Sequence, residues 1–266
     1  MVSTADPSAP RHDHSGRPEN EAIAERLGVL ALSLLVERSE ALTPSCRRLR
    51  LGGPDLADLD PLPGQDLMIS LGTGGERTRR RRYTIRRLER GGPTVDLDIA
   101  LHGDGPGMRW ATMAEPGQPV EAIGPRGKIT LDPDARWHLF IGDDSFAPAA
   151  LNMAEAVPEH QAVVLAIEID GPGHEQPSEI RAPVAGPRWV VRDGAHPGGP
   201  TALMAALAET ELPSGRGHAY VGGEHAVVGA LRDALIDRGM EAESVSNKPY
   251  WRLGRQNADN GEPERA

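Results

Sequence analysis

The stretch "RRRRYTIRR", residues 79–87, gathers six arginines in a chain of 266 residues whose formal net charge is −10. Successive side chains of an extended strand point to opposite faces. We therefore expect Arg81, Tyr83 and Ile85 on one face of a strand. The opposite face carries Arg80, Arg82, Thr84 and Arg86. An acidic protein with such a strand either meets a strongly anionic ligand there or protects an edge strand by charge.

A tyrosine beside a fixed arginine suits a ligand that carries both a flat ring and a phosphate. The aromatic side chain can stack on the ring, and the guanidinium can bind the phosphate through two parallel hydrogen bonds. A flavin dinucleotide has both groups. The segment "HGDGPGMRWATMAEPG", residues 102–117, predicts a loop that opens a short helix. Its glycines allow close backbone approach and the helix start can bind an anion, although a plain turn is the alternative.

Outward from the arginine strand, residues 27–133 consist of short strand candidates separated by Gly/Pro turns. Strands of this length and spacing predict a small antiparallel β-barrel, which would bind the cofactor. The turn "GPRG", residues 124–127, is expected to close it. The strand candidates are 29–42, 46–53, 66–72, 81–89, 94–103, 119–127 and 128–132.

From residue 134 to 254 strand and helix patterns alternate, which predicts a parallel α/β nucleotide-binding domain. The chain is therefore expected to be an α+β protein of two domains. Residues 1–26 are predicted to be a disordered tail and residues 255–266 a flexible one. The strand candidates of the second domain are 136–145, 161–170, 187–194 and 217–224, and its helix candidates are 146–157, 199–211 and 225–240.

Composition excludes several classes of protein. An isoelectric point near 5.4 argues against a general nucleic-acid-binding protein, which needs a basic surface. The single cysteine, Cys46, excludes an intrachain disulfide and a cluster held by four thiolates. The longest apolar run, residues 27–36, is far shorter than the roughly 20 residues of a membrane helix. It predicts a first core strand, and we expect a cytoplasmic protein without membrane insertion.

Six motifs in order resemble the siderophore-interacting protein family, whose members are FAD-dependent ferric-siderophore reductases of ferredoxin-reductase-like fold. The resemblance covers residues 33–255 and includes the Arg-x-Tyr-Thr pattern at Arg81. The motifs are "RRYTIR", "HGDGPGMRWA", "GPRG", "FIGDDSFAPAALNMAE", "YVGGEHAVVGALRDAL" and "YWRLG".

The resemblance implies roles for individual residues. Arg81 would serve the FAD phosphates, Tyr83 would lie against the isoalloxazine, and Thr84 would sit near its N5. The loop from His102 onward would line the pyrophosphate, and the acidic turn after the first α/β strand would approach the adenine end or the cleft. The residues expected to bind cofactor are Arg81, Tyr83, Thr84, Ile85, His102, Gly105, Gly107, Met108, Trp110, Asp143 and Ser145, with Asp144 beside them.

Ferric siderophores are often anionic, so a cationic pocket is expected near the flavin. Lys248 and Arg252 flank two aromatic residues in a segment that otherwise has no reason to be aromatic. Pro249 stands where the family usually has glycine, and Met108 where a small residue is expected. The residues expected to bind substrate are Lys248, Tyr250, Trp251 and Arg252, and further candidate cations are Arg47, Arg48 and Arg255.

The function implied is transfer of electrons from NADPH, NADH or a ferredoxin through FAD to an Fe(III)-siderophore, which releases Fe(II) for iron assimilation. The flavin performs the chemistry, so no catalytic side chain and no resident metal is expected. Two alternatives stay open. One is a flavin reductase of the same fold that serves an oxygenase or another acceptor. The other is a flavin- or siderophore-binding protein without turnover.

The nicotinamide side has weaker signals. No Gly-x-Gly-x-x-Gly follows a strand, so a dinucleotide bound in the Rossmann manner is not indicated. The turn "VGGEHA", residues 221–226, is either the nicotinamide-side turn or an ordinary strand-to-helix turn. A 2′-phosphate contact for NADPH needs a basic residue. Candidates for it are Arg181, Arg188 and Arg192.

Overall fold

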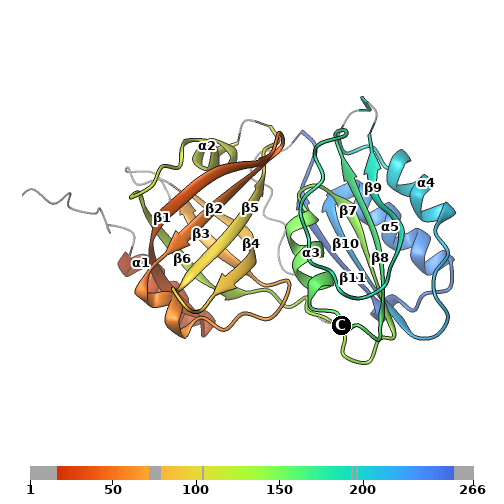
Figure 1. Ribbon diagram of the computed structural model, residues 1–266, viewed down its shortest axis with the longest axis horizontal. Helices are drawn as coiled ribbons and strands as arrows, with labels where there is room; N and C mark the ends of the chain where they lie inside the picture. Colours follow the sequence, from red (N-terminus) through yellow and green to blue (C-terminus); the bar gives the residue numbers. More distant parts are fainter. Residues whose placement is uncertain (1–16, 72–78, 104, 193, 196, 255–266) are drawn as a thin grey trace, which may run out of the picture.

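Two units follow one another along the chain in the computed structural model (Figure 1). The first is a closed antiparallel barrel and the second a parallel sheet with helices, so the predicted fold class is confirmed. None of the described helices is long and apolar enough to cross a membrane. The predicted tail at 255–266 and the first 16 residues of the predicted N-terminal tail lie outside the described residues. The structure describes residues 17–71, 79–103, 105–192, 194–195 and 197–254.

Six strands close the barrel in the order β1-β2-β5-β4-β3-β6. Alternation along the strands places aliphatic side chains inside. In β2, Leu49 and Leu51 are fully buried, whereas Arg48 lies on the other face and binds Asp98 of β5. The elements of this unit are β1 (Leu30–Thr43), β2 (Cys46–Gly52), the 3-10 helix η1 (Pro54–Asp58), β3 (Asp66–Leu71), β4 (Arg79–Glu89), β5 (Thr94–Ala100), α2 (Pro106–Met113) and β6 (Pro119–Arg126).

Helix α1 (Arg17–Leu27) corrects the prediction that residues 1–26 form a disordered tail. It packs on β1 and β6 of the barrel and buries Asn20 and Ala24. A short helix with few apolar side chains leaves little periodicity in the sequence. Its stability comes from packing on the barrel, which a local pattern does not reveal.

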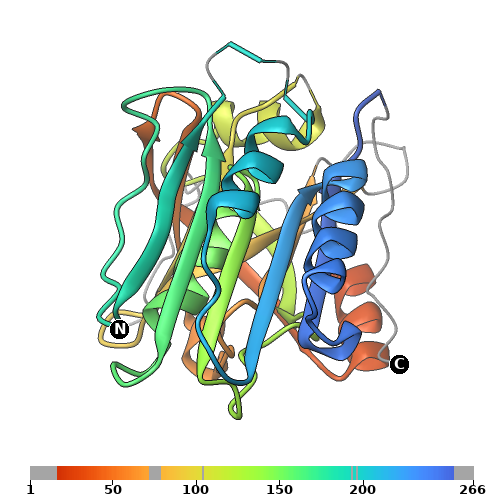
Figure 2. The same cartoon turned by 90° about the vertical axis from the view of Figure 1, so that its right-hand side faces the viewer.

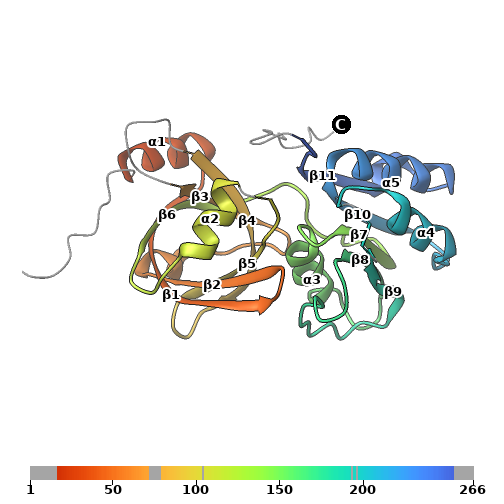
Figure 3. The same cartoon turned by 90° about the horizontal axis from the view of Figure 1, so that it is seen from above.

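Five parallel strands in the order β11-β10-β7-β8-β9 form the second unit. Helix α3 lies on the face turned toward the barrel, and α4 and α5 cover the opposite face (Figures 2 and 3). Because both faces are covered, β7 and β10 are buried along their whole length. The elements are β7 (Trp137–Asp143), α3 (Ala147–Glu155), β8 (Ala162–Ile169), β9 (Val184–Val191), α4 (Thr201–Glu209), β10 (Gly217–Glu224), α5 (His225–Asp237), the 3-10 helix η2 (Ala242–Ser244) and β11 (Val245–Trp251).

Strand β11 was not predicted, because residues 248–252 were assigned only to a substrate-binding segment. It pairs in parallel with β10 at the edge of the sheet, with Pro249 opposite Gly223. An edge strand tolerates proline because one of its sides makes no ladder hydrogen bonds. Apart from Val245 its residues are only half-buried, so the strand has no alternating apolar face to signal it.

Two short segments after the barrel differ from the prediction. Residues 128–132, expected as a strand, form none. Their side chains Ile129 and Leu131 pack on the core of the second unit, so the segment links the two units. Gly124–Arg126, expected as a turn, are the last residues of strand β6.

A buried arginine joins the two units. Arg86 of β4 is 3% exposed and donates to both carboxylate oxygens of Glu155 on α3, at 2.6 and 2.7 Å. It also donates to the carbonyl of Pro177 at 3.1 Å, and its own carbonyl accepts a hydrogen bond from Asn152 at 3.2 Å. These bonds fix α3 against the barrel and thereby set the distance between the two walls of the site.

Candidate functional site between barrel and sheet

The Arg-x-Tyr-Thr motif that begins at Arg81 lies against the start of α2. The rings of Tyr83 and Trp110 stack with centroids 5.6 Å apart and planes 23° from parallel. Gly107 lies over Tyr83 and Arg81: a Cβ there would come within 2.3 Å of the Tyr83 hydroxyl and 3.5 Å of Arg81 Cγ. Only glycine allows this approach, so the structure brings together four of the predicted cofactor residues.

The first turn of α2 offers its backbone to an anion. Gly105 is the N-cap residue and makes no side-chain capping bond, and Pro106 occupies the first helical position. The first N–H groups of a helix have no intrahelical acceptor, and they carry partial positive charge. Arg81, whose Nη1 donates to the Arg80 carbonyl at 2.7 Å, adds a full positive charge nearby. Together these groups fit a pyrophosphate.

Other predicted residues of this wall take different positions. The side chain of Ile85 lies in the barrel core at 3% exposure rather than in the cleft. The side chain of Met108 runs along α2, where its sulfur is 3.4 Å from the Thr112 hydroxyl. Burial raises the pKa of the Tyr83 phenol and Arg81 opposes the rise, so this hydroxyl stays protonated. It can therefore donate a hydrogen bond.

Strand β11 supplies the facing wall. Tyr250 of β11 lies near Thr84 of the barrel; burial raises the pKa of the Tyr250 phenol, and Thr84 is among the groups that oppose the rise. Lys248 Nζ lies 5.3 Å from the centre of the Tyr250 ring and 3.1 Å from the buried carboxylate of Asp66. Lys248 and Tyr250 were predicted to bind substrate. The structure places both between the two units, where they hold β11 against the barrel.

Sequence reasoning missed the groups around Lys248. A narrow cavity of about 20 Å³ lies between the units and is lined by Lys248, Tyr250, Arg82 and Lys128, among others. Arg82 donates to Asp66 at 2.7 Å, so Asp66 is shared by two cations. These residues come from four separate segments, and no spacing in the sequence signals that they meet.

Trp251, at the end of β11, connects the barrel loop to the strand ends of the sheet. Its ring lies 5.2 Å from that of His102, and its Nε1 donates to Asp143 at 2.9 Å. Asp143 also accepts bonds from the backbone N–H and hydroxyl of Ser145, and from the N–H of Glu224 at 2.8 Å. The predicted residues His102, Asp143, Ser145 and Trp251 therefore lie together at one end of the cleft.

Asp144 is the titratable group with an unusual pKa at this edge. Burial raises its pKa to about 7, and the neighbouring Asp143 adds to the rise while Arg192 opposes it. Burial also raises the pKa of Glu168 on the next strand, again against Arg192. The edge therefore holds carboxyl groups that are difficult to ionise together.

The remaining candidate cations that the structure describes have partners within the protein. Arg252 Nη2 lies 2.7 Å from His225 Nε2 at the start of α5. Arg48 binds Asp98 through two hydrogen bonds, and Arg47 donates to Ser39. Arg255 lies outside the described residues.

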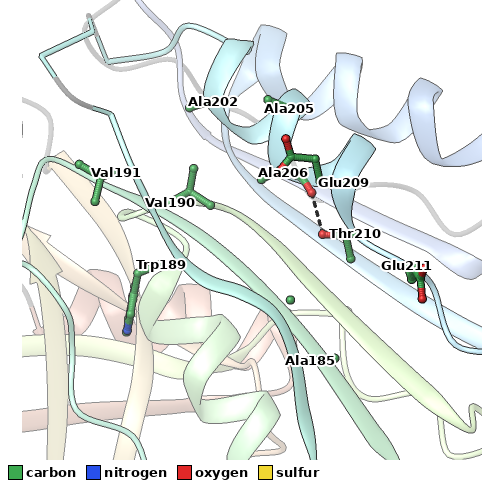
Figure 4. A pocket seen from close by; sticks show the side chains of 11 residues that line it. Ala185, Trp189, Val190, Val191, Ala202, Ala205, Ala206, Glu209, Thr210 and Glu211 are labelled. Atoms are coloured by element: carbon green, nitrogen blue, oxygen red, sulfur yellow. Dashed lines mark hydrogen bonds between the residues drawn. The ribbon is translucent and has the colours of Figure 1, made fainter.

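A wider hollow of about 650 Å³ lies on the far edge of the sheet, between β9 and α4 (Figure 4). Its lining is mainly alanine and valine, with Glu209, Thr210 and Glu211 at one end, and the Thr210 hydroxyl bonds back to the Ala206 carbonyl. None of the predicted cofactor or substrate residues lines it. Most of the predicted residues lie in the cleft between the units, which is therefore the candidate site.

Known proteins share both halves of this arrangement. Residues 69–129 match the siderophore-interacting FAD-binding domain and residues 135–254 match the siderophore-interacting protein model. The ferric vibriobactin reductase of Vibrio cholerae is 32% identical over 182 residues, which are 66% of this chain and 65% of that protein. The matched region thus spans a little under two thirds of the curated relatives' length.

Solved structures agree. A siderophore utilization protein from T. fusca has 28% identity and a TM-score of 0.77, with coverage of 87% of this chain and 96% of its own. The siderophore-interacting protein SipS of Aeromonas hydrophila has 29% identity and a TM-score of 0.74, with 85% and 93% covered. A phthalate dioxygenase reductase at 19% identity and the FAD/NAD-binding domain of a Vibrio cholerae nitric oxide dioxygenase at 15% share the fold alone. The chain belongs to the siderophore-interacting protein family.

Proposed function

We propose that this protein is an FAD-dependent reductase that passes electrons from a reduced nicotinamide to an Fe(III)-siderophore. The observation that carries the proposal is the close fit of Gly107 over Arg81 and Tyr83 at the uncapped start of α2. The match of residues 69–129 to an FAD-binding domain supports it, as does the likeness to a ferric vibriobactin reductase.

The residues on this wall fit the cofactor. Arg81 and the first N–H groups of α2 would hold the pyrophosphate, and Gly107 lets α2 approach Tyr83 and Arg81 closely. Tyr83 and Thr84 would flank the flavin ring, with Tyr250 near Thr84. Bound FAD supplies the link between a two-electron hydride donor and acceptors that take one electron.

The substrate side of the cleft is the end of β11. Trp251 and Arg252 lie there. Lys248 and Tyr250 instead lie against the barrel, where Lys248 binds Asp66 and holds the strand in place. Siderophores hold Fe(III) with hard oxygen ligands, and reduction to Fe(II) weakens that chelate. The protein needs to position the chelate and exclude water, and no side chain has to supply a proton or a nucleophile. We place the reaction in the cytoplasm, with a ferredoxin as the other donor that fits.

The test is anaerobic turnover of the purified protein loaded with FAD. NADPH or NADH is added first, then a ferric siderophore and a chromogenic Fe(II) chelator. The proposal expects bleaching of the flavin by the nicotinamide and its recovery on addition of the ferric chelate, with Fe(II) formed. Protein that does not retain FAD contradicts the proposal. Flavin that is reduced but recovers only with an added protein acceptor favours the oxygenase-type reductase instead.

A further inference from the structure

The carboxyl ends of the parallel strands are where an open α/β sheet binds nucleotides. Helices that begin there usually direct their free N–H groups at a ligand phosphate. In this chain α3 begins after β7 and α5 begins directly after β10. A carboxylate of the protein caps the start of α5, and another accepts hydrogen bonds in the turn before α3.

Glu224 occupies the start of α5. It is the N-cap residue and is 3% exposed. One carboxylate oxygen accepts the N–H groups of Ala226 and Val227, and the other accepts the N–H of Leu253 at 3.1 Å. The donors that would bind a phosphate at this helix are therefore bound to a negatively charged side chain.

Asp143 accepts hydrogen bonds in the turn between β7 and α3, whereas α3 itself begins after Phe146 without a side-chain cap. Asp143 is 4% exposed, and its two oxygens accept four hydrogen bonds, from Ser145, Glu224 and Trp251. Gly223 presses on it, since a Cβ at that glycine would lie 2.5 Å from an Asp143 carboxylate oxygen. A phosphate could enter this turn only by displacing a carboxylate that is packed and fully bonded.

Of the three arginines predicted for a 2′-phosphate, Arg181 is exposed just before the amino end of β9, away from the carboxyl ends of the strands. The other two have protein partners. Arg192, at the end of β9, is 7% exposed and donates to Glu168 at 2.9 Å and to Asp170. Arg188 donates to the hydroxyl of Ser178. Arg192 therefore lies between two acids, which cancel its attraction for a phosphate.

We propose that Asp143, Glu224 and the Arg192 ion pairs close the phosphate positions of the sheet, so that the nicotinamide donor is bound weakly and without discrimination between NADPH and NADH. This inference rests on the proposed function. The nicotinamide would reach the flavin from the mouth of the cleft while the phosphates of the donor stay outside the strand ends. Asp143 and Glu224 then lower the affinity for either nicotinamide donor through their charge.

The test is equilibrium binding of NAD⁺ and NADP⁺, the unreactive oxidised forms, to the oxidised FAD-loaded protein by calorimetry. In the wild type the two Kd values should agree to within about threefold, because no arginine reads the 2′-phosphate. Glu224→Gln keeps an oxygen for the helix cap but removes the charge. We expect it to lower both Kd values about fivefold, the effect of one nearby charge in a partly screened site.

Two further variants keep the result interpretable. Asp143→Asn should also lower both Kd values. If Glu224→Gln does not fold, the Kd values of Asp143→Asn provide the test. Asp233→Asn, a mostly exposed acid on α5, is the matched control and should leave both Kd values unchanged.

Wild-type protein that binds NADP⁺ more than about tenfold tighter than NAD⁺ overturns the inference, since that ratio requires a dedicated 2′-phosphate contact. Unchanged or weaker binding in both charge-removing variants also overturns it. Reoxidation of chemically reduced protein by the ferric chelate tests the proposed function separately, because it needs no nicotinamide.

Discussion

Arg81 and Gly107 carry the case for a bound dinucleotide at the scale of single residues. A side chain at Gly107 would collide with the Tyr83 hydroxyl, which explains the glycine at this position. Arg81 stands beside a helix start that no side chain caps. A merely protective charge on an edge strand would require neither feature, and β4 is in fact paired on both sides within the barrel.

Arg81→Ala should weaken FAD binding by about 10- to 100-fold, the worth of a charge-assisted hydrogen bond to a phosphate. Titration of FAD-depleted protein with FAD, followed by flavin fluorescence, measures the effect. Arg87→Ala is the control, since that arginine lies on the same strand and pairs with the exposed Glu179. Wild-type affinity in Arg81→Ala would remove the main support for the proposed cofactor site.

Asp144 predicts a dependence of stability on pH. Its pKa is raised from the ordinary 3.8 to about 7, so the native protein keeps a proton that the unfolded chain releases. The unfolded state then binds fewer protons, and the free energy of unfolding falls as pH rises from about 4 to 7. Asp144→Asn has no such carboxyl group, so the variant should not lose this part of its stability as pH rises.

Urea denaturation at two pH values tests the point. The stability gained by Asp144→Asn over wild type should be about 1 to 3 kcal/mol larger at pH 8 than at pH 5. An equal gain at both values would show that Asp144 is ionised in the native protein throughout this range.

At the scale of elements, the sequence predicted most strands and helices because their signals are local. Alternation in β2 and β5 and the continuous apolar run of β8 depend on neighbours a few residues away. Helix α1, strand β11 and the linker 128–132 were missed because tertiary packing decides them. Ile129 and Leu131, for example, belong to the core of a unit that begins later in the chain.

The contact between β4 and α3 gives a prediction at the same scale. Arg86→Met leaves the Glu155 carboxylate without its buried partner, which should cost about 3 to 5 kcal/mol in free energy of unfolding. Arg86→Met combined with Glu155→Leu should recover most of that loss, because no unpaired charge remains. Arg87→Ala, on the exposed side, should cost under about 1 kcal/mol. A loss in Arg86→Met no larger than that of Arg87→Ala would contradict the role assigned to Arg86.

For the whole molecule, the site exists only because two units meet. The sequence indicated the residues of each wall, Arg81 and Tyr83 on one side and Asp143 and Trp251 on the other. It could not indicate that Lys248 would bind Asp66, or that Glu224 would cap its own helix, because these contacts depend on how β11 lies against the barrel. Motifs therefore predicted which residues lie between the two units better than they predicted what those residues contact.

The most direct measurement is a single turnover with chemically reduced, FAD-loaded protein and excess ferric siderophore under anaerobic conditions. The account predicts that the oxidised flavin spectrum returns as two Fe(II) form per FAD, since the flavin carries two electrons and each Fe(III) accepts one. A flavin that stays reduced in the presence of the ferric chelate, or that is reoxidised without Fe(II), would contradict the central claim.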